Sequence, residues 1–237
     1  MTLQAIQSQT KGAASSGMMH LVGLFEELQS DRQNALRFQV KELLLKFPVA
    51  ARNNRQLDVS KFNILSICGL GPDEVQHSSI LAWLLDENAS HGKGSAFFAA
   101  LASIIGLKLN DAPKGYSVYA EFAGFESITD IVVYKTGDFY ISIENKINAC
   151  EGDDQLNREY RDREAYANSL NISNERRIAV FLTPDGRPPV TGNPKKWVSL
   201  SYPQIASAFN SIPYPESLQK LRFFVEDWTA SIRGYPQ

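Results

Sequence analysis

The spacing of hydrophobic residues changes along the chain, and each spacing predicts a different element. From Met18 to Phe47, apolar residues recur every three or four positions, which indicates one long helix or two helices broken near Ser30. Pro48 ends this segment, and a polar linker follows it. We therefore separate an N-terminal helical segment with a flexible start, residues 1–60, from a globular domain, residues 61–237.

The globular domain contains the spacings of both helices and strands. Helical spacing predicts helices at 73–85, 95–105, 153–170, 202–211 and 216–233. Alternation with a period of two predicts strands at 116–122, 127–134 and 138–146. A continuous apolar run at 177–183 is typical of a strand buried on both faces, and 197–201 is predicted to be an edge strand. This order of elements predicts an α/β fold in which helices flank a mixed central β-sheet.

Three charged side chains meet on the hairpin predicted at 127–146. Alternation puts Asp130 on one strand and Glu144 and Lys146 on the next, and the turn at Gly137 brings all three to the same end of one face. Two carboxylates and an ammonium at the edge of an apolar sheet cost free energy unless something uses them, as a divalent cation would. A cross-strand ion pair explains the same residues without catalysis, and spacing alone favours that explanation.

Composition and charge limit the class of protein. The hydrophobic fraction of 43% and the net charge of −2 are ordinary for a globular protein, and they provide no global basic field. A nonspecific DNA coat protein is therefore disfavoured, whereas an enzyme with a local groove is not. Two cysteines without zinc-type spacing favour a reducing, cytoplasmic setting. We expect no signal peptide and no membrane span, because the longest weakly polar run, 95–107, is too short.

Several short motifs surround the charged hairpin. They are EVQHSSILAWLLD (74–86), HGKG (91–94), IENKI (143–147), QLNREY (155–160) and FLTPDG (181–186). Together with Asp130, they are similar to a bacterial and phage branch of the PD-(D/E)XK nuclease superfamily, over about residues 61–210. Thr129 replaces the proline of the motif's name, a position that varies in the superfamily. The resemblance implies a restriction-endonuclease-like αβββαβ core.

The resemblance also implies a reaction, the hydrolysis of phosphodiester bonds in DNA by water that Mg²⁺ or Mn²⁺ activates. Asp130 and Glu144 would hold the metal, with the Asn145 carbonyl as a candidate third ligand. Magnesium suits this set because it prefers oxygen ligands and keeps several waters. Lys146 would orient or deprotonate the attacking water and stabilise the charge on phosphorus.

Two residues outside the hairpin are further candidates for the catalytic site. Glu74 begins the first core helix, which often contributes a carboxylate to the metal site in this superfamily. The alternative is a glutamate favoured at a helix N-terminus by the helix dipole. The resemblance implies that Gln155 holds the water or Lys146, although a glutamine in a polar helix is most often solvated.

The two histidines of the motifs and a pair of lysines are candidates for contact with the substrate. His77, one turn after Glu74, either contacts phosphate or is a hydrogen-bonded structural histidine. His91, in a glycine-flanked loop, is more readily structural or substrate-contacting than a metal ligand. Lys195 and Lys196 lie after a proline- and glycine-rich loop and could contact a nucleic-acid backbone.

The helix predicted at 153–170 offers a second candidate surface for the substrate. Arg158 could contact phosphate, and Tyr160 could stack on a base or simply pack. However, Glu159, Asp162 and Glu164 alternate with the arginines, which fits an ordinary ion-paired surface.

We therefore expect a Mg-dependent deoxyribonuclease that works in bacterial or phage DNA processing or defence, as a homodimer or with a partner subunit. RNA stays open as a substrate. The alternative is a non-catalytic nucleic-acid-binding or interaction subunit of a defence complex that retains the nuclease fold. The intact Asp130, Glu144 and Lys146 argue against that alternative, because an inactive site has no reason to keep buried charges.

Overall fold

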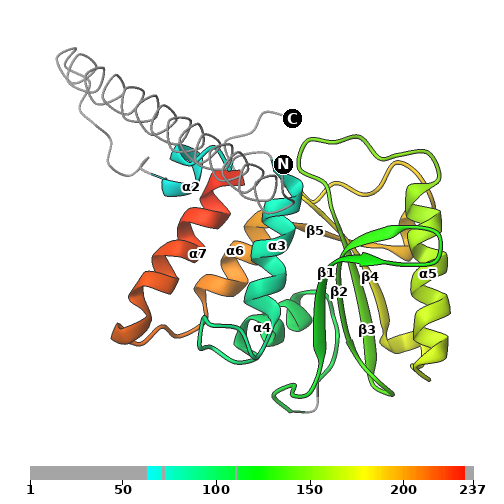
Figure 1. The fold of residues 1–237 in the computed structure, drawn as a ribbon, viewed down its shortest axis with the longest axis horizontal. Coiled ribbons are helices and arrows are strands. Elements are labelled where there is room, and N and C mark those ends of the chain that lie inside the picture. The colour runs from blue at the N-terminus through cyan, green and yellow to red at the C-terminus, as the bar shows by residue number, and fades with distance from the viewer. Residues whose placement is uncertain (1–62, 71–72, 110, 233–237) are drawn as a thin grey trace, which may run out of the picture. The chain divides into compact units, whose positions relative to one another are not determined.

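The computed structural model describes residues 63–70, 73–109 and 111–232. The chain divides into two units, Met1–Phe62 and Asn63–Gln237, and the predicted N-terminal helical segment lies outside the described residues. In the second unit, helices cover both faces of a five-stranded sheet (Figure 1). None of the helices that can be described is long and apolar enough to cross a membrane.

The sheet is mixed, with its strands in the order β1-β2-β3-β4-β5. The first two pairings are antiparallel and the last two are parallel. The carboxyl ends of β3 and β4 and the β1–β2 turn therefore lie at the same edge of the sheet. The strand bounds are within one residue of those predicted, and β5 is an edge strand as predicted. The strands are β1 (Ser117–Ala123), β2 (Ile128–Lys135), β3 (Phe139–Asn145), β4 (Arg177–Thr183) and β5 (Val198–Ser201).

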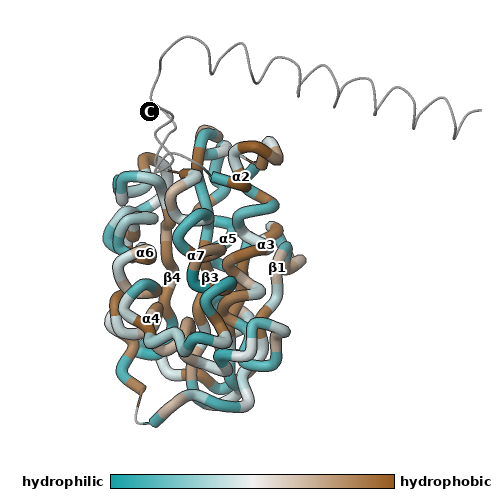
Figure 2. Tube along the Cα trace, turned by 90° about the vertical axis from the view of Figure 1, so that its left-hand side faces the viewer, coloured by the Kyte–Doolittle hydropathy of each residue, from teal (hydrophilic) through white to brown (hydrophobic). Residues whose placement is uncertain are grey.

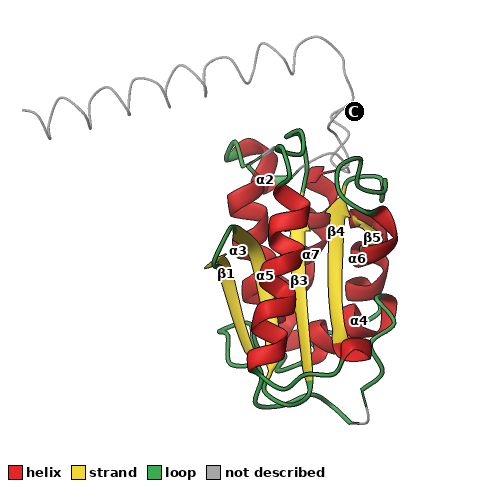
Figure 3. Ribbon diagram, turned by 90° about the vertical axis from the view of Figure 1, so that its right-hand side faces the viewer, coloured by secondary structure: helices red, strands yellow, loops and turns green. Residues whose placement is uncertain are grey.

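The helices divide unequally between the two faces (Figures 1 and 3). One face is covered by α3 (Glu74–Leu85), α4 (Ala96–Ile104), α6 (Tyr202–Asn210) and α7 (Gln219–Ile232), and the short α2 (Ile64–Ile67) contacts α7. The other face is covered by α5 (Gln155–Ser169). The helix predicted from 216 begins instead with a 3₁₀ turn, Glu216–Leu218, and two further 3₁₀ turns are Asn174–Arg176 and Pro194–Lys196. The predicted α/β class is confirmed.

The two faces of the sheet differ in how they are packed. The main hydrophobic core lies on the side of α3, α4, α6 and α7, and its largest fully buried side chains include Trp228, Phe97, Phe98, Phe139 and Phe209. Figure 2, seen from that side, shows hydrophobic and hydrophilic positions alternating along these helices. Between α5 and the sheet, the apolar residues form only two small clusters. Buried polar groups occupy much of the remaining α5 interface.

The acidic residues of α5 do not form the uniform ion-paired surface that the sequence suggested. Glu164 does pair with Arg163 and Arg177, at 2.6 and 2.9 Å. Glu159 and Asp162, however, are 1% and 3% exposed. That part of the prediction is wrong, because these two side chains lie on the helical face turned toward the sheet.

Asp162 holds the turn between β1 and β2. Its carboxylate accepts hydrogen bonds from the backbone N–H groups of Phe125, Glu126 and Ser127, at 2.9 to 3.1 Å, and from the Ser127 hydroxyl at 2.6 Å. Gly124 lies so close that a Cβ there would come within 2.2 Å of Asp162 Oδ2. The turn therefore needs both the carboxylate and the absence of a side chain at Gly124.

We expect Asp162→Ala to lower the free energy of unfolding by roughly 1.5–3 kcal/mol, because it removes a charged acceptor from several backbone donors. Urea unfolding followed by circular dichroism measures this loss. Asp153→Ala is the control, because Asp153 is exposed and only its backbone carbonyl accepts a hydrogen bond, from Arg158, in the described part of the chain. Equal destabilisation by the two substitutions would contradict the role of Asp162.

Candidate active site

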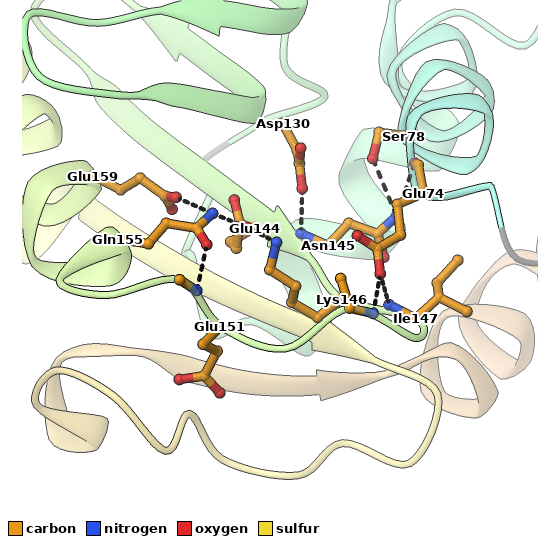
Figure 4. A network of polar contacts seen from close by, with 12 residues as sticks. Glu74, Ser78, Asp130, Glu144, Asn145, Lys146, Ile147, Glu151, Gln155 and Glu159 are labelled. Atoms are coloured by element: carbon orange, nitrogen blue, oxygen red, sulfur yellow. Dashed lines mark hydrogen bonds and ion pairs between the residues drawn. The ribbon is translucent and has the colours of Figure 1, made fainter. Parts of the chain in front are cut away.

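The charged hairpin residues gather at the edge of the sheet where β3 ends and α5 begins. Figure 4 shows Asp130 of β2, Glu144 at the end of β3, Lys146 just after it, and Gln155 and Glu159 of α5 around one point. The first four were expected to lie together, and the structure brings them together. Glu159 is an addition that the sequence analysis had placed on the surface.

Asp130 is joined to the neighbouring strand through its side chain. Its Oδ2 accepts a hydrogen bond from the backbone N–H of Asn145 at 2.7 Å. Burial, and after it the charge of Glu144, raises the pKa of Asp130 to about 7, although this hydrogen bond opposes the shift. The carboxyl group thus lies where its negative charge is poorly compensated by the protein.

Glu144 is a deeply buried carboxylate, with 1% of its surface exposed. Its Oε1 forms an ion pair with Lys146 Nζ at 2.8 Å and accepts a hydrogen bond from Gln155 Nε2 at 2.6 Å. Burial and then the charge of Glu159 raise its pKa to about 8, although Lys146 opposes the shift. For Lys146, burial disfavours the charged form, but the charge and hydrogen bond of Glu144 outweigh burial and raise the pKa of the ammonium.

Gln155 connects two carboxylates with one amide group. Its Nε2 donates to Glu144 Oε1 at 2.6 Å and to Glu159 Oε1 at 2.9 Å, while its Oε1 accepts from the Gly152 N–H at 3.1 Å. Burial raises the pKa of Glu159 to about 7. Helical spacing could have found Glu159, because it lies four residues after Gln155 and three after the buried Leu156.

The loop after β3 is fixed by Glu74, at the start of α3. Glu74 Oε1 accepts hydrogen bonds from three consecutive backbone N–H groups, those of Ile147, Asn148 and Ala149, at 2.8 to 3.0 Å. The residues after Lys146 are therefore held against α3. This arrangement gives Glu74 a positioning role, whatever its second oxygen binds.

Asn145 lies on the opposite face of β3 from Glu144. Its side chain donates to Ser78 Oγ at 3.1 Å and to the Glu74 carbonyl at 3.3 Å, and its Oδ1 accepts from the Tyr202 hydroxyl at 2.9 Å. The side chain is fully used in the helical layer, so only the backbone carbonyl of Asn145 stays a candidate metal ligand.

The site supplies carboxylate ligands for a metal ion but not a complete coordination shell made of protein side chains. Among the described residues, no three His, Cys, Asp or Glu side chains converge closely enough to hold an ion. Magnesium is commonly bound by one or two carboxylates plus waters, so such a cage is not required. Asp130 and Glu144 fit that pattern, because Asp130 is half-buried, Glu144 is buried, and the Glu144 Oε2 accepts no hydrogen bond from the protein. The donor set therefore fits a hydrated Mg²⁺ or Mn²⁺.

The two histidines lie in the interior, away from this cluster. His77 is 1% exposed and its Nδ1 accepts a hydrogen bond from Trp228 Nε1 at 2.9 Å, in the helical layer. His91 is 4% exposed and bonds the Asp86 carbonyl and the Lys93 N–H. These positions favour the structural role that was the alternative for each, and they leave His77 without a surface for phosphate.

The basic substrate-binding candidates lie around Tyr160. Lys196 Nζ is 4.0 Å from the centre of the Tyr160 ring, and the Arg163 guanidinium is 4.3 Å from it. Lys195 and Lys196 are exposed on their 3₁₀ turn. Arg158 donates to the Asp153 carbonyl at 2.8 Å and is partly exposed. Of the basic candidates, Lys196 is therefore the one that lies against Tyr160.

A cavity of about 260 Å³ opens beside Lys146, between the loops that follow β3 and β4. Its lining includes Lys146, Cys150, Pro184, Asp185 and Arg187. This cavity could not be predicted from hydrophobic spacing, because its walls are loops whose positions depend on hydrogen bonds.

Glu151 anchors the outer wall of the cavity. Its carboxylate accepts hydrogen bonds from Arg187 Nη1, from the N–H of Val190, and from both the N–H and the hydroxyl of Thr191, at 2.6 to 3.0 Å. Burial opposes ionisation of Glu151, but these donors outweigh it and lower the pKa to about 2. The sequence analysis did not identify Glu151, because its partners are mostly backbone donors.

The architecture is that of a restriction-endonuclease-like α/β protein. A family model of the PD-(D/E)XK nuclease superfamily matches residues 62–228, and the chain therefore belongs to that superfamily. No curated protein and no solved structure is significantly similar to the chain. The resemblance inferred from the motifs is confirmed at the level of the superfamily, whose members are nucleases that generally use divalent metal ions.

The lowered pKa of Glu151 predicts a pH-dependent contribution to stability. Its ordinary pKa is 4.5 and its folded pKa is about 2, so the stabilisation is complete above pH 4.5 and is lost as the pH falls through about 2. We expect Glu151→Gln to lower the melting temperature at pH 7 and the difference from wild type to narrow below pH 4.5. Thermal unfolding of both proteins between pH 7 and about pH 2 measures this difference in melting temperature. Glu216→Gln, at an exposed glutamate, is the control. A constant difference at all pH values would contradict this assignment.

Proposed function

We propose that this member of the nuclease superfamily is a metal-dependent deoxyribonuclease that hydrolyses phosphodiester bonds with activated water. The observation that carries the proposal is the meeting of the buried Glu144 with the half-buried Asp130 and Lys146 at the end of β3, where Lys146 forms an ion pair with Glu144. Membership of the superfamily supports the reaction class. DNA as the substrate, and a role in bacterial or phage DNA processing or defence in the cytoplasm, follow from the sequence resemblance.

Asp130 and Glu144 are the residues that would hold Mg²⁺ or Mn²⁺, with the Asn145 carbonyl as the third candidate. When bound, such an ion lowers the pKa of its water and neutralises charge on the phosphate. Gln155 fixes the rotamer of Glu144 by donating to Oε1. Glu74 fixes the loop after Lys146. The functional groups are thus held before substrate arrives, which is what preorganised catalysis requires.

Lys146 acts as a cation in this scheme. The pKa of its ammonium is raised, so at neutral pH it is a hydrogen-bond donor and cannot take a proton from water. Of the two roles expected from the sequence, orienting the water and stabilising negative charge on the phosphate is the one that its charge state supports. Loss of Lys146 would also leave Glu144 without its ion-pair partner.

The substrate would approach over α5 and the loop before β5. Lys195, Lys196 and Arg158 supply positive charge there, and Tyr160 supplies an aromatic surface between cations. Cutting both strands of a duplex requires two such sites, and for that reason we propose a homodimer or a partner subunit as the working form.

We expect wild-type protein to cleave plasmid and linear DNA with Mg²⁺ or Mn²⁺ and to be inactive in EDTA. Lys146→Ala and Glu144→Ala should each lower the rate by about 100-fold or more, the effect of losing one group that stabilises charge in the transition state. Lys220→Ala, on the exposed side of α7, is the matched lysine control and should cleave at the wild-type rate.

Cleavage that survives both Lys146→Ala and Glu144→Ala would show that the site lies elsewhere. Wild-type protein that binds DNA without cutting it under any metal would favour the non-catalytic binding subunit instead. Faster cleavage of RNA than of DNA, with the same dependence on Lys146, would keep the mechanism and change the substrate.

We further expect Lys195→Ala and Lys196→Ala to weaken DNA binding similarly for all sequences. Each should reduce the slope of log affinity against log salt by about one, because each would remove one phosphate contact. Fluorescence anisotropy with labelled duplex, in Ca²⁺ and at several salt concentrations, measures this slope. A slope unchanged in both variants would remove these lysines from the proposed substrate path.

A further inference from the structure

Buried polar atoms without a hydrogen bond gather in one place. In the part of the chain that the structure describes, four such side-chain atoms occur: Ser142 Oγ, Glu144 Oε2, Glu159 Oε2 and Arg163 Nε. Two belong to β3 and two to α5, so all four lie at the interface between that helix and the sheet. Buried polar atoms in proteins are nearly always paired, and a concentration of exceptions points to something that the interface binds.

The carboxylates of Glu144 and Glu159 are arranged as a pair. Each carboxylate is 1% exposed, and the Oε1 of each accepts a hydrogen bond from the same nitrogen, Gln155 Nε2. Figure 4 shows the Gln155 amide between the two carboxylates. Since the amide and Lys146 take up the Oε1 atoms, the Oε2 atoms are the ones left for another partner.

The charges around this pair do not balance. When ionised, Asp130, Glu144 and Glu159 carry three negative charges, against the one positive charge of Lys146, which pairs with Glu144. Buried uncompensated charge is strongly unfavourable, and one divalent cation would neutralise the two charges that are left over.

We propose that Glu144 and Glu159 are the two carboxylates that hold the divalent cation at this site, each through its Oε2 atom. The inference rests on the proposed function for the presence of such an ion. Gln155 is then a positioning residue, which holds both carboxylates by Oε1 and leaves Oε2 for the metal. Two carboxylates with waters suffice for Mg²⁺ or Mn²⁺. The ion would connect α5 directly to the end of β3.

The test is binding of Mn²⁺ alone to the full-length, metal-stripped protein, followed by the electron paramagnetic resonance of free Mn²⁺. We expect Glu159→Gln to weaken Mn²⁺ binding at least tenfold, as the loss of a group that holds or supports a metal does. Glu164→Gln is the matched control on the same helix, because the Glu164 carboxylate pairs with Arg163 and Arg177. It should bind Mn²⁺ as the wild type does.

A stability measurement separates loss of a ligand from loss of the fold. Without metal, Glu159→Gln removes a buried charge, so its melting temperature should equal or exceed that of wild type. The rise in melting temperature caused by Mn²⁺ should be smaller in this variant than in wild type. Glu159→Asp, which keeps the charge but shortens the side chain, should weaken Mn²⁺ binding as well and serves if the glutamine variant does not fold.

Unchanged Mn²⁺ affinity in both Glu159 variants would overturn the inference, and a proton shared by Glu144 and Glu159 would then explain the pair. That result leaves the proposed nuclease standing if the wild type still cleaves DNA with metal. Conversely, Mn²⁺ binding that depends on Glu159, in a protein that cuts no nucleic acid, would support the metal site and overturn the proposed function.

Discussion

The burial of Glu144 is the constraint on which this site depends. A carboxylate placed at the end of a central strand, under a helix, must be compensated where it lies because water cannot reach it. Lys146 supplies charge and Gln155 supplies a hydrogen bond, and both are within a few residues of that strand or of the helix that covers it. The first residue of α5 and the residue that follows β3 are thus both bound to this one buried group.

Single carboxylates that collect several donors also fix the segments around the site. Glu74 binds three consecutive N–H groups after β3, Glu151 binds the loop after β4, and Asp162 binds the turn between β1 and β2. Loops have few regular backbone hydrogen bonds. An ionised carboxylate that accepts hydrogen bonds from several loop N–H groups therefore satisfies donors that would otherwise lack an acceptor. The functional groups can then lie on loops without losing their geometry.

The sequence predicted the parts of this structure that depend on periodicity. Strand bounds, the mixed sheet and the meeting of Asp130, Glu144 and Lys146 all follow from alternation and from the order of elements. It failed for Glu159 and Asp162, because alternating charges on a helix look alike whether they face water or a polar interior. The bonds of Glu74 to three N–H groups, and those of Glu151 to the Val190 and Thr191 N–H groups, could not be foreseen, since every sequence possesses backbone donors.

The helical phase of α5 is set by polar residues. Gln155, Glu159 and Asp162 share the face turned toward the sheet, and each residue of a helix advances the rotation by about 100°. Inserting or deleting one residue between Gln155 and Asp162 would therefore turn one end of this set away while the other stayed in place. We therefore expect α5 to tolerate substitutions on its solvent-facing side. Insertions and deletions should be tolerated only before Gln155 or after Asp162.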